Sequence, residues 1–148
     1  MGQQKVNKRK SIEMDRADSA WKFAEESKKL AKKGSKEYRG VDEKYASHAK
    51  EFPMLILTHG LLNAVAFAYD KKKNDEGWKL IYEHISQWLG EGKENRLLSN
   101  EFSSKKCLMP ILLNLRDDTT KLRLITNEII SLFIWLKRFV AKLDEKTT

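Results

Sequence analysis

A long run of apolar residues near the carboxyl end constrains the fold of this chain more than any other feature. The residues recur at spacings of three and four, the repeat of one face of an α-helix. They are Leu122, Ile125, Ile129, Leu132, Phe133, Leu136, Phe139, Val140 and Leu143. The run predicts a helix capped by Asp118 or Thr119 and about 37 Å long at 1.5 Å per residue, as long as a small domain is wide.

The same spacing recurs along the rest of the chain. We expect helices over residues 11–33, 35–52 and 75–90, each with one apolar face. Two prolines and seven glycines in 148 residues are too few for the turns of a β-sandwich or barrel, and no strand pattern is evident. The prediction is an all-α fold, a single-domain compact helical bundle of about five to six helices.

The stretch from Phe52 to Tyr69 contains no lysine, arginine, aspartate or glutamate. Its length just reaches that of a membrane-spanning helix. However, polar side chains, His59 among them, lie near its middle, where hydrocarbon disfavours them. We therefore expect a buried central helix over residues 54–69, with Pro53 ending the helix before it. His59 would then be a hydrogen-bonded core histidine rather than a metal ligand.

The two ends of the chain and one internal segment complete the expected domain organisation. Residues 1–10 are polar and basic, and we expect a flexible basic N-terminal arm, followed by one helical-bundle domain over residues 11–148. Residues 91–118 suggest short helices interrupted near Pro110. The N-terminal residues lack the apolar segment of a secretory signal, and the single cysteine, Cys107, cannot build a disulfide framework. Both observations favour the cytoplasm.

Positive charge is concentrated in the outer thirds of the sequence. Lysine and arginine number 29 against 21 acidic residues, a net charge of +8. Residues 1–51 hold 14 basic and 9 acidic side chains, residues 52–100 hold 6 and 6, and residues 101–148 hold 9 and 6. A field of this sign attracts polyanions. From charge alone, a nucleic-acid ligand and a lysine-rich surface that serves only solubility are equally good interpretations.

Side chains that carry catalysis or bind metals are sparse. His48, His59 and His84 lie far apart, and no second cysteine accompanies Cys107, so the ligand spacing of a metal site is missing. No glycine-rich phosphate-binding loop occurs. We therefore predict no enzymatic activity, no catalytic or metal-ligating residue, no cofactor and no small-molecule substrate.

Three basic clusters are the candidates for binding. They are the lysines of residues 22–33, the run Lys71-Lys72-Lys73, and Arg123, Arg138 and Lys142 in the last helix. Each cluster alone is typical of a solvated helix face, but phosphate contacts add along a strand, so three clusters favour a polyanion groove. Ile130 and Ile134 lie off the main apolar face of the last helix, which favours packing against another subunit.

Several short motifs follow one another in an order typical of one protein family. They are Arg16-Ala17, Ala20-Trp21, Lys36-Glu37-Tyr38, Phe52-Pro53, Gly60-Leu61, Ala66-Phe67 with Lys71, Trp88-Leu89, Thr126 with Glu128, and Trp135-Leu136-Lys137-Arg138-Phe139. With these motifs the sequence resembles the small helical subunit of the Cmr effector complexes, the type III-B CRISPR–Cas ribonucleoproteins, over residues 15–90 and 118–143. It departs from the family pattern at His59, Leu122 and Asn127, and in a longer connection before the last helix.

The resemblance implies a non-catalytic protein of antiviral defence that stacks with copies of itself into a minor filament. This filament would lie beside the RAMP-fold backbone subunits and the large subunit, where guide RNA and target RNA pair. Carried over by motif position, the resemblance implies Arg16, Lys71, Lys137 and Arg138 as nucleic-acid-binding residues. Recognition would be of backbone and shape, since the guide supplies base pairing.

Helix geometry alone adds Lys50 and Lys142 as nucleic-acid-binding candidates. Trp135 has the chemistry to stack on a base, but we expect a packed tryptophan. The alternative function is a helical protein–protein interaction module without direct nucleic-acid contact. A third hypothesis places the basic helices on anionic lipid, but we expect no membrane partner.

Overall fold

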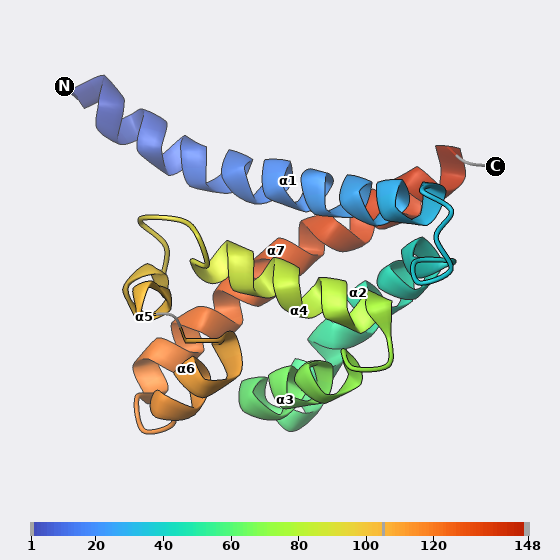
Figure 1. Ribbon diagram of the computed structural model, residues 1–148. Coiled ribbons are helices and arrows are strands. Elements are labelled where there is room, and N and C mark those ends of the chain that lie inside the picture. The colour runs from blue at the N-terminus through green and yellow to red at the C-terminus, as the bar shows by residue number, and fades with distance from the viewer. Residues whose placement is uncertain (1, 105, 147–148) are drawn as a thin grey trace.

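The computed structural model describes residues 2–104 and 106–146, with side chains described for residues 12–104 and 106–141. Seven helices and no strand occur among those residues (Figure 1). They are α1 (Gly2–Lys32), α2 (Val41–His59), α3 (Leu61–Lys71), α4 (Glu76–Leu89), α5 (Ser99–Ser103), α6 (Leu108–Asn114) and α7 (Thr119–Lys146). The prediction of an all-α fold is confirmed. The short α5 and α6 bring the number of helices above the expected five to six.

α4 occupies the centre of the bundle. Ten of its fourteen residues are buried, and it packs against α1, α2 and α3 (Figure 1). The Asp75 side chain caps the helix by accepting a hydrogen bond from the backbone N–H of Trp78 at 3.1 Å, and Gly90 ends it. The helix expected over residues 75–90 is therefore confirmed, together with both of its ends.

The expected central helix over residues 54–69 is divided between two elements. α2 runs through Pro53, which is buried inside the helix, and the chain turns instead at Gly60, whose φ of 86° favours glycine. Met54 and Leu57 are 60% and 71% exposed, because no other element of the described chain covers that face of α2. The prediction of a buried helix here was wrong, and α4 holds the central place.

α7 is the helix that the apolar run predicted. It begins at Thr119, and Asp118 Oδ1 accepts a hydrogen bond from the backbone N–H of Lys121 at 3.0 Å. Its apolar face packs against α1 and α2. Where α1 crosses it, the rings of Trp21 and Phe139 meet edge to face, with centroids 5.2 Å apart.

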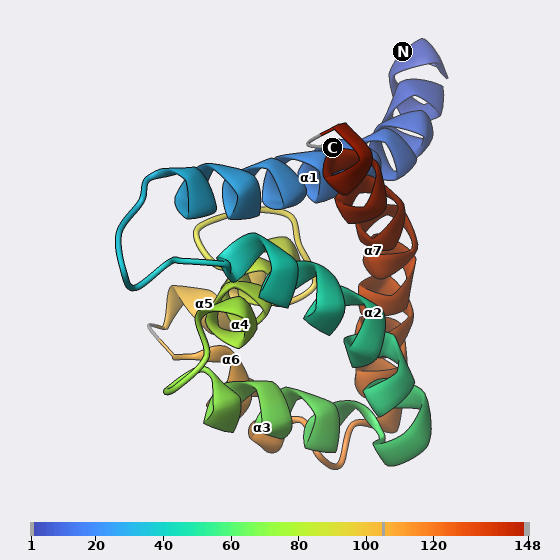
Figure 2. The ribbon, with the colours of Figure 1, turned by 90° about the vertical axis from the view of Figure 1, so that its right-hand side faces the viewer.

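α1 is longer than the sequence suggested. It begins at Gly2, so the expectation that the first helix starts at Ser11 was wrong, and residues 2–10 form its first turns where an arm was expected. Figure 1 and Figure 2 both show this first part of α1 extending beyond the other helices.

Residues 91–118 fold back against the end of α4. Leu98 is fully buried, and its backbone N–H donates a hydrogen bond to the last residue of α4 at 2.8 Å. A Cβ atom at Gly90 would lie only 2.6 Å from the backbone nitrogen of Ser99, so this close approach requires glycine. Pro110 lies in the first turn of α6, where its missing N–H is unpaired in any case, and does not interrupt a helix as we expected.

Candidate nucleic-acid interface

The carboxyl half of α7 presents two neighbouring cations. Leu136 and Val140 are buried in the core, which leaves Lys137 and Arg138 exposed on the outer side. The Arg138 guanidinium lies over the Trp135 ring, 5.8 Å from its centroid, and Trp135 packs against the core as expected. In the described part of the chain neither cation has a carboxylate partner. Their charge is open to a phosphate.

Lys50 lies on α2 toward the same end of the molecule. α2 and α7 pack together in opposite directions (Figure 2), and the rings of Phe52 and Phe133 lie 5.4 Å apart. Lys50 lies two residues before Phe52, and Lys137 lies one turn after Phe133. Because the two helices run in opposite directions, both residues are displaced from that contact toward the same end of the helix pair. Lys50 is exposed and has no acidic partner among the described side chains. We refer to Lys50, Lys137 and Arg138 as the α2–α7 basic surface.

Lys71 lies elsewhere. It ends α3, which Figures 1 and 2 place at the opposite end of the molecule from the carboxyl half of α7. The Lys71 Nζ atom lies 5.5 Å from the Phe67 ring centroid, and the Lys72 Nζ atom lies 4.8 Å from that of Tyr69. The predicted basic residues therefore do not form one continuous strip.

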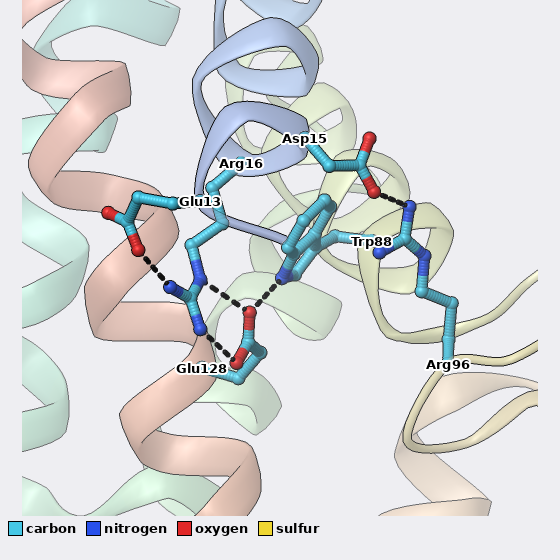
Figure 3. Close-up of polar contacts among 6 residues, drawn as sticks. All are labelled: Glu13, Asp15, Arg16, Trp88, Arg96 and Glu128. Atoms are coloured by element: carbon cyan, nitrogen blue, oxygen red, sulfur yellow. Dashed lines mark hydrogen bonds and ion pairs between the residues drawn. The ribbon is translucent and has the colours of Figure 1, made fainter. Parts of the chain in front are cut away.

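Arg16 lies inside an ion-pair network (Figure 3). Its Nε and Nη2 atoms donate to the two carboxylate oxygens of Glu128, each at 2.9 Å, and Nη1 donates to Glu13 at 2.7 Å. The indole N–H of Trp88 donates to the same Glu128 carboxylate at 3.1 Å. The hydrogen bond from Arg16 holds the pKa of Glu128 below its usual value, against the opposing effect of burial. Arg16 therefore joins α1 to α7.

Arg96 extends this network from the loop after α4. It pairs with Asp15, the neighbour of Arg16 on α1, and its guanidinium carbon lies 4.4 Å from the Trp88 ring centroid (Figure 3). Sequence reasoning missed this pair, because its members lie 81 positions apart. The motifs that contain Arg16, Trp88 and Glu128, which carried the family resemblance, meet at this point.

His84 is a buried histidine that the sequence did not single out. It is 2% exposed, its Nδ1 lies 2.7 Å from the Tyr45 hydroxyl, and its Nε2 lies 2.7 Å from a Glu26 oxygen. The Phe23 ring stacks on the imidazole with centroids 4.1 Å apart. The hydrogen bond with His84 lowers the pKa of Glu26, and burial raises the pKa of Tyr45. These contacts join α1, α2 and α4.

The other two histidines lie apart from His84. His48 Nε2 lies 3.1 Å from Asp75, and its ring stacks on Trp78. His59 is exposed at the end of α2, so the expectation of a core histidine was wrong; the turn at the next residue leaves this end of α2 facing water. Among the described side chains no group of three potential metal ligands occurs.

Two further findings concern the membrane and the candidate residue Lys142. Within the described ranges no helix combines the length and the apolar character needed to cross a bilayer. The backbone of Lys142 is part of α7, but its side chain lies outside the described residues. Its role in binding nucleic acid therefore stays a prediction.

These features define a class: a small, basic helical-bundle protein with exposed cations, Lys50, Lys71 and Lys137 among them, that have no acidic partner in the described part of the chain. A family model, that of the CRISPR-associated protein Cas_Cmr5, matches residues 12–143. The chain therefore belongs to the Cas_Cmr5 family and is a subunit of the Cmr complexes of CRISPR defence. The match spans every predicted site residue from Arg16 to Lys142, and the resemblance found in the motifs is confirmed.

Proposed function

We propose that this protein is a non-catalytic small subunit of a type III-B Cmr ribonucleoprotein and acts in the cytoplasm. We propose further that its α2–α7 basic surface binds the backbone of the guide RNA or target RNA. The observation that best supports this is the pair Lys137 and Arg138, exposed and without an acidic partner in the described chain. A phosphate backbone supplies the missing counter-charge.

Binding at this surface is independent of base sequence. Ammonium and guanidinium groups on helix faces contact phosphates, which are alike at every nucleotide. Sequence recognition is left to the guide, whose base pairing selects the target. Unrelated single-stranded RNAs should therefore bind with similar affinity.

Two further lysines extend this proposal, and one arginine is left out of it. Lys71 belongs to a separate cluster at the end of α3, where it forms a second phosphate contact. Lys142 follows Arg138 by four residues in the sequence, and we propose it as a further phosphate contact on that spacing alone. Arg16 is omitted, because its donors are already bound to Glu128 and a neighbouring carboxylate.

Exposed apolar side chains supply a protein-binding face. Met54, Leu57 and Ile134 are 60%, 71% and 48% exposed, whereas Ile130 packs partly against the core. Apolar groups of this size are stabilised by burial against another protein. We propose that they contact a second copy of the chain in a minor filament, and that RAMP-fold backbone subunits and the large subunit flank that filament.

Binding of the full-length protein to unrelated single-stranded RNAs, measured by fluorescence anisotropy over a range of salt, tests the RNA proposal. Replacing Lys137 and Arg138 by alanine should lower the salt slope of log K by about 1.4, because two phosphate contacts are lost. Lys22→Ala with Lys79→Ala is the matched control, since both lysines already have acidic partners. An affinity that does not change with salt, or equal losses in both double variants, would overturn the proposal.

The alternative is a protein–protein interaction module without RNA contact. It predicts that the wild-type protein and the Lys137→Ala, Arg138→Ala variant recover the same partner proteins from cells. It also predicts that neither protein crosslinks to RNA in the nuclease-treated complex. A crosslink at wild-type α7 that the variant loses excludes this alternative.

A further inference from the structure

A surface pocket of about 500 Å³ opens beside the Arg16–Glu128 network. It lies between α1, the end of α4, the loop that follows α4, α5 and the first three turns of α7. Its floor is apolar, and its rim carries polar groups together with the exposed side chain of Ile12. Trp88, Leu89 and Leu97 form the floor, and Asn95, Asn100 and Lys121 lie on the rim.

The rim holds polar groups that the protein itself does not satisfy. The side chains of Asn95, Asn100 and Lys121 make no hydrogen bond or ion pair within the described chain. The other two charged groups are neutralised, Arg96 by Asp15 and Glu128 by Arg16. Two free carboxamides and one unbalanced positive charge therefore face a ligand.

A planar surface lies at the same place. The Arg96 guanidinium carbon lies 4.4 Å from the Trp88 ring centroid, so the guanidinium covers the indole, and the ion pair with Asp15 holds it there (Figure 3). Guanidinium planes and aromatic rings are the groups on which unstacked RNA bases pack. Carboxamides carry a donor and an acceptor, which match the hydrogen-bonding edges of bases.

We propose that this pocket binds one unstacked nucleobase of an RNA strand. Asn95 and Asn100 hydrogen-bond the edge of the base, and Lys121 contacts the adjoining phosphate. An apolar side chain of a partner protein fits the floor but leaves both carboxamides and the ammonium group without partners, which disfavours that occupant. The inference rests on the proposed RNA-binding function and adds a second kind of contact to it.

The pocket is distinct from the α2–α7 basic surface. Lys121 lies in the first turn of α7, about 24 Å along the helix axis from Lys137 at 1.5 Å per residue. The two sites can therefore be tested separately. A failure of the pocket leaves the phosphate contacts of Lys137 and Arg138 in place.

The indole resonance of Trp88 in the isotope-labelled full-length protein reports on the pocket. Titration with adenosine 5′-monophosphate and uridine 5′-monophosphate should shift this resonance in a saturable way. Ribose 5-phosphate, which has the phosphate but no base, should bind at least about five-fold more weakly, as expected for the loss of a hydrogen bond. Absence of a saturable shift with either nucleotide overturns the proposal, and so does an equal response to ribose 5-phosphate.

Two variants link the shift to the named side chains. Asn100→Ala and Lys121→Met should each weaken nucleotide binding by about five-fold. Asn127→Ala, at an exposed asparagine elsewhere on α7, and Lys137→Ala are the matched controls and should bind nucleotides as the wild type does. Nucleotide shifts that persist unchanged in both pocket variants contradict the proposal. The lower salt slope of RNA binding expected for Lys137→Ala with Arg138→Ala is a separate result and tests the proposed function.

Discussion

Glu128 accepts two parallel hydrogen bonds from Arg16, which lies 112 residues away in the chain. Trp88 donates to the same carboxylate, so the Glu128 side chain on α7 binds residues of both α1 and α4. The side chains of the pair are 18% and 22% exposed, so water screens their attraction only in part. The motifs that mark the family thus include the residues that join its two longest helices.

Loss of Arg16 should destabilise the fold. Arg16→Ala leaves the Glu128 charge in a site with little water, and we expect the free energy of unfolding to fall by about 2 kcal/mol. Urea denaturation at neutral pH measures this. Glu13→Ala removes the exposed partner of the same arginine and should cost less than about 0.5 kcal/mol. Similar costs for the two variants contradict the structural role of the pair.

Acid should weaken the protein through the same carboxylate. The pKa of Glu128 is lower in the folded chain than in the unfolded chain, because Arg16 donates to it. Its contribution to stability is therefore complete above the unfolded pKa of about 4.3, and is lost as the pH falls through the folded pKa. Glu128→Gln removes the titrating group, so its unfolding free energy should change less between about pH 6 and about pH 3. Parallel curves for variant and wild type would disprove this.

The hydroxyl of Tyr45 should matter to stability, because it is buried and hydrogen-bonded. Tyr45→Phe leaves the buried His84 Nδ1 without its partner, and we expect a loss of about 1–2 kcal/mol in thermal or chemical unfolding. Tyr38→Phe is the control, because this half-buried tyrosine makes no hydrogen bond through its side chain within the described chain. A cost no greater than that of the control refutes the prediction.

Gly90 should tolerate alanine less well than Gly34 does. Both glycines have positive φ, 144° and 75°, so both substitutions strain the backbone. Only at Gly90 does the added Cβ meet backbone atoms, at 2.6 Å, whereas the space at Gly34 is open. We expect Gly90→Ala to cost about 3 kcal/mol or more in urea denaturation. Equal costs would show that the loop after α4 moves aside freely.

The exposed apolar face of α2 should act in association and not in folding. Met54→Ser with Leu57→Ser should leave the melting temperature unchanged within error, since both side chains are mostly exposed. Self-association measured by sedimentation should weaken about ten-fold or more. Leu113→Ser, at an exposed leucine of α6, is the control and should associate as the wild type does. Unchanged association of the double variant argues against this face as the stacking surface.

Helices whose signals are local could be predicted from the sequence. α7 follows from an unbroken apolar run and an aspartate before it, and α4 follows from its own run between Asp75 and Gly90. Each signal depends on residues within a turn or two of one another, so the chain carries it wherever the helix packs. The all-α class, the exposure of Lys50, Lys137 and Arg138, and the family follow in the same way.

Features that depend on distant partners could not be predicted. The uncharged stretch after Pro53 resembles a buried helix, but whether another element covers Met54 and Leu57 depends on the whole arrangement. Gly60 and Pro53 are both residues at which helices commonly end, and the sequence alone does not show at which of them the chain turns. In the sequence, Arg16 has the same appearance as Lys137, that of a cation on an exposed helix face, because its partner Glu128 lies 112 residues away.

By itself, the sequence determined which segments form helices, where several of them begin and end, and how much positive charge the protein carries. These properties arise from backbone hydrogen bonds, capping side chains and composition, which act within a few residues or simply add. Only the tertiary structure decided that α4 is central, that Arg16 is bound by Glu128, and that Lys137 and Arg138 have no acidic partner among the described side chains. Burial and ion pairing depend on groups that folding brings together from far along the chain, and no local pattern records those distances.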